Sequence, residues 1–349
     1  MKNKLKHLVP VLLALATITG SLSACELKPK AQQKVSKQGF YFDTIIQITL
    51  YGTTDEKYID DCFDMAKKYE DMLSNTVSYS EVSKINDAAG KEYVTVSNDT
   101  LELLNKGIEN GDTSDGRFDI TIGKLSDLWN FSEIAENTDS KDNEVDASVV
   151  PSDAQIQSEL SHVNYRNIQI NGNNVMLTDS KAKLDLGGIA KGFIADKMKA
   201  YLQSKKITSG IINLGGNVLT VGEKSDGSDY TVGIQKPFDE SGEPICTVKV
   251  KDKSVVTSGI YERYYRVDGK LYHHILDTTT GYPVKNNLYS VTIISDSSCD
   301  GDALSTTCFA LGIDKAKKLI NSLSGVEAIF VTNDYSIITT SDEYNVSTE

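Results

Sequence analysis

The amino-acid sequence predicts an α+β fold with mixed or antiparallel sheets and packed helices. Strand-like segments rich in Thr, Ile, Val and Tyr occur in clusters, and amphipathic helical stretches are interspersed among them. This arrangement is typical of an α+β or mixed α/β protein. No internal repeat appears, and about 325 residues follow an N-terminal leader, enough for one large or two modest domains.

The first 24 residues predict a lipoprotein signal peptide. Three lysines form a basic start, residues 8–18 are apolar, and Leu22-Ser23-Ala24-Cys25 ends the stretch with small residues, resembling a bacterial lipobox. The apolar run is too short for a spanning helix. We expect cleavage before Cys25, lipid (palmitate among the acyl groups) on its sulfur, and a membrane anchor on the extracytoplasmic face. The alternative is an ordinary signal peptide with an incidental cysteine. Residues 25–38 are polar and predict a tether, so the folded domain is expected at residues 39–345.

The elements of the first half follow from local patterns. In chain order we expect a strand at 40–51, an amphipathic helix at 57–73, a helix ending at glycine at 100–111, an acidic surface insertion at 133–153, and a hairpin with strands at 168–170 and 175–177.

Residues 183–195 predict a short strand, a glycine pair and a helix that opens directly onto the pair. Gly187 and Gly188 leave the backbone bare where the free amides of the helix start point outward. Asp185 precedes them and Lys191 follows one turn later. This junction suits a phosphate group, and it matches neither the P-loop nor the dinucleotide-binding pattern.

The second half continues the alternation of strands and helices. We expect strands at 210–214, 230–235, 246–250 and 289–294, helices at 302–311 and 314–323, and two strands within 328–340.

Charge and cysteine content exclude several classes of function. The net charge of −13 repels nucleic acid, so a phosphate ligand needs a local group of cations. Cys62, Cys246, Cys299 and Cys308 have irregular spacings that match no disulfide or metal pattern.

Asp302, Ser305 and Thr306 offer oxygen ligands for a metal ion. Standing at i, i+3 and i+4 near an expected helix start, they share one helix face. A carboxylate with hydroxyls suits Mg²⁺ better than zinc. The alternative is that Asp302 only caps the helix.

His273 and His274 lie at an expected strand end before a Thr-Gly-Tyr-Pro turn. Neighbouring strand residues face opposite sides, so one histidine should face a site, where it could act as a base that titrates near neutrality. Both could instead be hydrogen-bonded without a chemical role. Phe118 could stack on an aromatic ligand and Asp119 could accept a hydrogen bond from it, although Phe in a strand more often belongs to the core.

Together and in this order, several segments resemble the ApbE family of flavin transferases. The matching segments are Phe118-Asp119-Ile120-Thr121, Asp185-Leu186-Gly187-Gly188-Ile189-Ala190-Lys191-Gly192, Asn213-Leu214-Gly215-Gly216-Asn217, Ser258-Gly259 with Tyr261-Glu262-Arg263, His273-His274-Ile275 with Asp277 and Thr280-Gly281, and Asp302-Ala303-Leu304-Ser305-Thr306.

The resemblance implies an ApbE-like (T-fold-like) architecture and an enzyme, an FAD:protein FMN transferase. Such an enzyme uses Mg²⁺ and moves the FMN half of FAD onto a Thr or Ser hydroxyl of an acceptor flavoprotein, releasing AMP. The acceptor would be a redox-complex subunit or an extracellular electron-transfer protein. It also implies the site residues. The metal would be held by the Gly188 carbonyl, Asp302, Ser305 and Thr306; FAD would contact Phe42, Arg117, Phe118, Asp119, Asp185, Lys191 and Leu276; His274 would be the catalytic histidine. In this chain Phe42-Asp43-Thr44 stands where the family has Met-Gly-Thr.

Three alternative functions are compared with this one. Water in place of the acceptor hydroxyl would make the protein an FAD pyrophosphatase that yields FMN and AMP. A non-catalytic flavin-binding lipoprotein that carries electrons would leave the Mg²⁺ face and His274 without a task. A binding protein of an iron or thiamine pathway is the third alternative.

Overall fold

The computed structural model describes residues 33–138, 143–239, 241–344 and 346–348. Cys25 and the expected signal peptide lie outside the described residues. For the residues that are described, no helix combines the length and the apolar character needed to cross a membrane.

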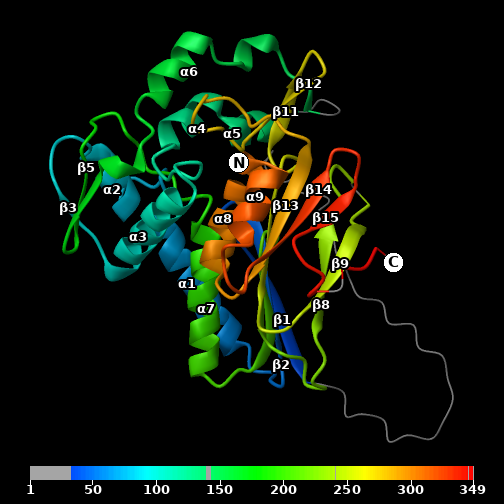
Figure 1. The fold of residues 1–349 in the computed structure, drawn as a ribbon. Helices are drawn as coiled ribbons and strands as arrows, with labels where there is room; N and C mark the ends of the chain where they lie inside the picture. The colour runs from blue at the N-terminus through cyan, green and yellow to red at the C-terminus, as the bar shows by residue number, and fades with distance from the viewer. Residues whose placement is uncertain (1–32, 139–142, 240, 345, 349) are drawn as a thin grey trace, which may run out of the picture.

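An eight-stranded sheet forms the centre of the fold (Figure 1). Its strand order is β1-β2-β6-β7-β10-β13-β14-β15. The bounds are β1 Lys34–Tyr41, β2 Thr44–Tyr51, β6 Ser209–Leu214, β7 Asn217–Gly222, β10 Ser254–Gly259, β13 Leu288–Ser295, β14 Glu327–Thr332 and β15 Ile337–Thr339. All its ladders are antiparallel, which confirms the expected fold class.

Smaller sheets surround it. A three-stranded sheet has the order β3-β5-β4, and two hairpins pair β8 with β9 and β11 with β12. The bounds are β3 Val94–Thr95, β4 Ile168–Asn171, β5 Asn174–Leu177, β8 Tyr230–Gln235, β9 Pro244–Val250, β11 Tyr264–Val267 and β12 Lys270–His273.

The helices connect and cover these sheets. They are α1 Lys57–Leu73, α2 Glu81–Asp87, α3 Asn98–Thr113, α4 Gly123–Trp129, α5 Phe131–Glu136, α6 Asp153–Leu160, α7 Ala190–Ser204, α8 Ser298–Leu311 and α9 Ile313–Ile320, with 3₁₀ turns at Ala147–Val149 and Tyr165–Asn167.

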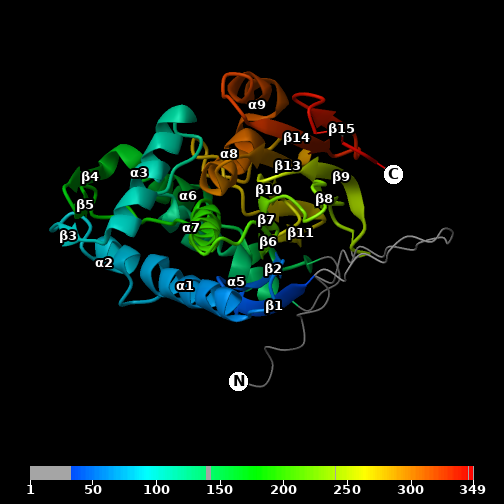
Figure 2. The ribbon, with the colours of Figure 1, turned by 90° about the horizontal axis from the view of Figure 1, so that it is seen from below.

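Two layers cover the central sheet. The helices α1, α7, α8 and α9 lie on one side of it and the β8–β9 hairpin on the other (Figure 2). Alternation along the strands explains this: Val255 of β10 and Ile294 of β13 pack with the hairpin, whereas the neighbouring Ile293 packs beneath α8. At one end of the sheet, α4, α5 and α6 pack with β11 around Trp129 and Tyr265.

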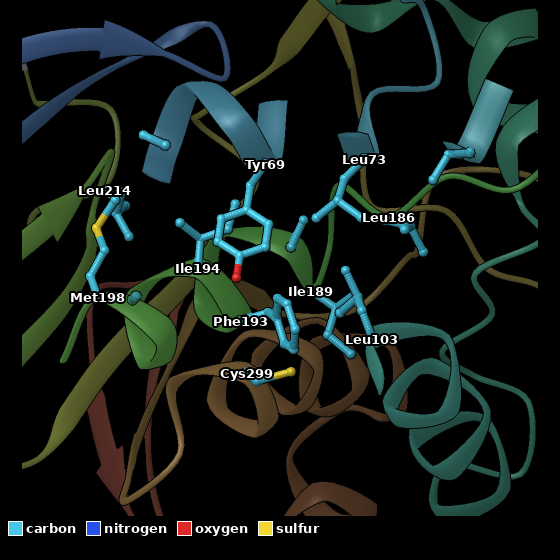
Figure 3. Close-up of a cluster of buried hydrophobic side chains, with 14 of the residues drawn as sticks. Tyr69, Leu73, Leu103, Leu186, Ile189, Phe193, Ile194, Met198, Leu214 and Cys299 are labelled. Carbon is cyan, nitrogen blue, oxygen red and sulfur yellow. The ribbon is translucent and has the colours of Figure 1, made fainter. Parts of the chain in front are cut away.

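Helix α7 is the central helix of the largest core cluster. Its side chains Phe193 and Ile194 lie between α1 and α8, and the Phe193 ring meets that of Tyr69 edge-on, with centroids 6.0 Å apart (Figure 3). Cys299 at the start of α8 packs against the same cluster. Burial of both helices in one core therefore sets how their N-terminal ends lie relative to each other.

The structure corrects several sequence expectations. Residues 40–51 form part of a hairpin, because Phe42 and Asp43 adopt positive φ angles of 54° and 53° and turn the chain back. Residues 34–38, expected in the tether, belong to β1. The expected strand at residue 183 is a single bridge between Lys183 and Ile122. The helix expected from Asp302 begins at Ser298, and Ser297 caps it by accepting from the Asp300 amide, so Asp302 is not its cap.

Candidate active site

One cavity collects wall residues from segments that are far apart in the sequence. They come from the stretches 117–132, 185–191, 215–217, 256–263, 274–278 and 302–306. The wall includes ten of the twelve cofactor, metal and catalytic residues expected from the sequence; Phe42 and Ser305 are not among the wall residues.

The two residues that lead into the glycine pair, Leu184 and Asp185, are held by hydrogen bonds to two other segments. Asn86 receives the Leu184 amide on Oδ1 at 2.7 Å and donates from Nδ2 to the Leu184 carbonyl at 3.1 Å. On the opposite side the Asp185 amide donates to the Ile120 carbonyl at 2.8 Å. The Asp185 carboxylate then accepts from the Gly187 amide at 2.9 Å. These hydrogen bonds thus fix residues 184–187 although the segment is not a regular strand.

Helices α7 and α8 meet directly behind this junction. A Cβ on Gly192 would lie 2.1 Å from the Ser298 carbonyl oxygen, so only glycine allows the helices to approach this closely. The Gly192 amide donates to Asp302 Oδ2 at 2.9 Å. One of the helix-start amides that we expected to bind a phosphate is therefore already hydrogen-bonded to the Asp302 carboxylate.

The expected metal residues are only partly brought together. Asp302 and Thr306 line the cavity opposite Gly188, whose ideal Cβ position is 4.0 Å from Thr306 Oγ1. Ser305 is 0 % exposed, donates to the Asp302 carbonyl at 2.8 Å, and is not a wall residue. Ser258 lines the cavity instead, with its Oγ 3.1 Å from Thr306 Oγ1 and 2.7 Å from Ser305 Oγ.

These oxygens fit a hard cation. The Asp302 side chain is 6 % exposed, and desolvation raises the pKa of its carboxyl although Lys191 and the Gly192 amide oppose the shift. A nearby cation would compensate this buried charge. Within the described ranges no three His, Cys, Asp or Glu side chains form a metal cluster. A site with one carboxylate plus hydroxyl and carbonyl oxygens resembles the way Mg²⁺ is held together with substrate phosphates.

The two histidines face opposite ways, as the strand geometry predicts. His273 is buried, with Nε2 3.0 Å from the Val284 carbonyl oxygen. His274 lines the cavity, and its amide and Nδ1 lie 3.1 and 3.3 Å from the Arg263 carbonyl oxygen. Desolvation, reinforced by the Arg263 guanidinium, lowers the pKa of His274 to about 3. The expectation of a base titrating near neutrality is therefore wrong for the ligand-free site, and His274 is neutral there.

Cations gather on the wall. Arg117 Nη1 donates to Asp277 Oδ1 at 2.9 Å and to Thr279 Oγ1 at 3.2 Å, so part of its charge is compensated. In the part of the chain that the structure describes, Lys191 and Arg263 line the cavity without an ion-pair partner. They stand beside the carboxyl groups of Asp185, Glu262 and Asp302 on the same wall, and they supply the cations that a phosphate ligand needs on an acidic protein.

The aromatic side of the cavity is built by the stretch after Arg117. The Phe118 ring lies against Gly188, 3.2 Å from its ideal Cβ position. Asp119 accepts from the Thr121 amide on Oδ1 and from the Tyr165 amide on Oδ2, both at 2.8 Å, and burial raises its pKa. Both oxygens thus organise the loop beneath the wall. Leu276 is buried on the far side of the same cavity.

Phe42 is not placed on the wall. Its amide donates to Glu70 Oε1 at 2.8 Å, and its side chain packs against the large core cluster. Only its neighbour Thr44 approaches the cavity, because it touches the wall residue Gly215. Sequence reasoning assigned no role to Asn217, Ser258, Glu262 or Arg263, all of which line the cavity. These four residues could have been identified from the sequence, because each lies in a segment that resembles the family.

Comparison with known proteins agrees with this geometry. The ApbE family model matches residues 42–330. A curated FAD:protein FMN transferase from Klebsiella pneumoniae (strain 342) is 37 % identical over 300 residues, covering 85 % of this chain and 89 % of that protein. One from Treponema pallidum is 32 % identical, covering 79 % and 77 %. The crystal structure of the ApbE protein from Thermotoga maritima superposes with a TM-score of 0.78 at 31 % identity, covering 88 % of this chain and 96 % of that one.

Proposed function

Because this chain belongs to the ApbE family, we propose that it is an FAD:protein FMN transferase, as its curated relatives are named. The observation that supports this most directly is the single cavity that joins Asp302 and Thr306, the unpaired cations Lys191 and Arg263, and the neutral His274.

The reaction that fits these groups is phosphoryl transfer. The hydroxyl oxygen of a Thr or Ser in the acceptor attacks the phosphorus on the FMN side of the pyrophosphate. The bond from that phosphorus to the oxygen of the AMP phosphate breaks, and AMP leaves. His274 takes the hydroxyl proton. A neutral imidazole can accept this proton without first losing one of its own.

The remaining wall residues stabilise charge. Lys191 and Arg263 attract the pyrophosphate oxygens, on which negative charge grows as the bond breaks. Asp302, Thr306 and the Gly188 carbonyl would hold Mg²⁺, which supplies further neutralisation at the phosphates when bound. Phe118, already against Gly188, offers an apolar ring surface to the flavin or adenine.

We also propose that the protein is anchored by lipid at Cys25 on the extracytoplasmic face of the cell membrane. The support is the basic start, short apolar run and Leu-Ser-Ala-Cys end of the leader. The acceptor is then a flavoprotein exposed on the same side, a redox-complex subunit or an extracellular electron-transfer protein.

A single incubation tests the activity. Purified protein is mixed with FAD, Mg²⁺ and a threonine-containing acceptor, and AMP is measured together with flavin fluorescence on the denatured acceptor. We expect AMP and acceptor-bound flavin in equal amounts. AMP with free FMN and no labelled acceptor would instead indicate a pyrophosphatase, and FAD binding without AMP would indicate a flavin carrier.

A further inference from the structure

Asn217 is a wall residue of the cavity and carries a buried amide. It is the first residue of β7, directly after the Gly215–Gly216 turn, and it pairs with Leu214 of β6. Its side chain is 2 % exposed, yet it belongs to the cavity wall.

The two ends of this amide differ. Oδ1 accepts from Ser298 Oγ at 2.7 Å, whereas Nδ2 has no partner among the described residues. Leaving a buried donor unpaired is unfavourable. The other buried side-chain groups without a partner in the described ranges belong to Ser254, Tyr265, Ser290 and Thr307, and none of these lines the cavity. Asn217 is thus the unpaired donor whose missing partner could be a ligand.

The orientation of the amide is held from behind. The Ser298 amide donates to Asp196 Oδ1 at 2.9 Å, which fixes the residue that donates to Asn217 Oδ1. Ser298 and Asp302 stand four residues apart on α8 and so lie on one helix face, one turn from each other. The partner of Asn217 Oδ1 therefore lies one helical turn from Asp302, which lines the same cavity as Asn217.

We propose that Asn217 Nδ2 donates a hydrogen bond to an oxygen of the FAD pyrophosphate, and that Ser298 is its positioning residue. This inference rests on FAD being the substrate. Phosphate oxygens are the strong acceptors of FAD, and hydrogen bonds to charged acceptors are stronger than neutral ones. A neutral amide adds such a bond without competing with the metal or with His274 for charge.

The test measures FAD affinity, in the presence of Mg²⁺, by fluorescence and by calorimetry. Asn217→Leu removes the donor and keeps the branching of the side chain at Cγ, and we expect FAD to bind about 10- to 100-fold more weakly. Asn217→Asp keeps an acceptor for Ser298 and sets a carboxylate against the phosphate, so its loss should be larger. Ser298→Ala should show a smaller loss. Ser290→Ala removes an equally buried unpaired group away from the cavity and should bind FAD like the wild type.

Riboflavin and adenosine, which lack phosphate, are the discriminating ligands. Their affinities should be the same for Asn217→Leu and the wild type. A fall in either by the factor seen for FAD would overturn the assignment to the pyrophosphate. Wild-type FAD affinity in Asn217→Leu would overturn the inference itself and assign Nδ2 to a bound water.

The proposed function can fail separately. A wild-type protein that binds FAD but labels no acceptor would contradict the transferase activity, while the effect of Asn217 on the FAD dissociation constant stays measurable. Circular dichroism and thermal unfolding confirm that each variant is folded. If Asn217→Leu does not fold, the nearly isosteric Asn217→Asp decides, and wild-type FAD affinity in it would overturn the proposal.

Discussion

One methyl group added at Gly192 should separate the two helices that carry the site. The new Cβ would lie 2.1 Å from the carbonyl oxygen and 2.5 Å from the carbonyl carbon of Ser298. Ordinary contact begins at 3.4 Å, so α7 and α8 must move apart by about 1.3 Å. Backbone atoms of a packed helix cannot rotate away as the tip of a side chain can.

The displacement sets the expected size of the effect. Overpacking of this kind costs about 1–3 kcal/mol of unfolding free energy, and the better helix propensity of Ala returns up to about 1 kcal/mol. The same displacement weakens the 2.9 Å bond from the Gly192 amide to Asp302 Oδ2 and moves Asp302 away from Gly188 and Lys191. Misplacement of reacting groups by about 1 Å can cost roughly 100-fold in rate. We therefore expect Gly192→Ala to be folded, slightly less stable and about 100-fold slower in transfer.

Urea unfolding and the rate of flavin incorporation at saturating FAD measure the two effects. Gly107→Ala is the control, because its new methyl meets side-chain atoms of Ile120, the nearest at 2.5 Å, and not the backbone of another helix. The control should lose little activity. Transfer by Gly192→Ala within twofold of the wild type would refute the idea that helix spacing positions the site.

Four further results are expected. Asp302→Asn keeps the acceptor for the Gly192 amide but removes the charge, so Mg²⁺-dependent transfer should fall by several hundredfold; full activity, or activity unaffected by chelator, would contradict the metal assignment. His274→Ala should slow transfer by about 10²–10⁴-fold while His273→Gln changes it little, and kcat/KM of the wild type, which reports the free enzyme, should show no rise through pH 6.5 because the pKa of His274 is about 3 in the ligand-free site; loss of activity in His273→Gln alone would reverse the assignment. The pKa of buried His273 is lowered from 6.5 to about 4 and that of His274 to about 3, so the unfolded chain binds protons that the folded chain does not, and each histidine should lower the unfolding free energy by up to ~1.4 kcal/mol per pH unit as pH decreases from 6.5 to 4; His273→Gln should remove its own share of the slope, and an unchanged slope in urea unfolding would contradict the lowered pKa of His273. Cys25→Ser should release the protein from the membrane fraction or block its processing, and unchanged retention would exclude the lipid anchor.

Sequence reasoning succeeded where periodicity or turn chemistry decides the structure. The helix α1 has the expected bounds, since its apolar face, with Cys62 and Tyr69, repeats at helical spacing. It failed at the β1–β2 turn, because Phe42 and Asp43 carry none of the glycine or asparagine signals of a two-residue turn. It also placed the start of α8 at Asp302, whereas Ser297 supplies the cap.

The candidate site was predicted by residue type better than by orientation. The spacing of Asp302, Ser305 and Thr306 places three oxygens on one face, but it cannot tell that Ser305 bonds back to the Asp302 carbonyl. The pKa of His274 depends on Arg263, which is eleven residues away in the sequence and beside it in space. Asn217 gains its interest only from a missing partner, which no sequence pattern records.

The amide clamp of Asn86 has a consequence for hydrogen exchange at the cavity rim. The Leu184 N–H is protected by one side chain, so a rotamer change of Asn86 can expose it without separating any two strands. The Asp185 N–H next to it is bonded to the Ile120 backbone and opens only when the two segments part. The two neighbouring amides should therefore exchange with deuterium at different rates. The ratio of the two exchange rates therefore distinguishes rotation of the Asn86 side chain from separation of the two backbone segments at the cavity wall.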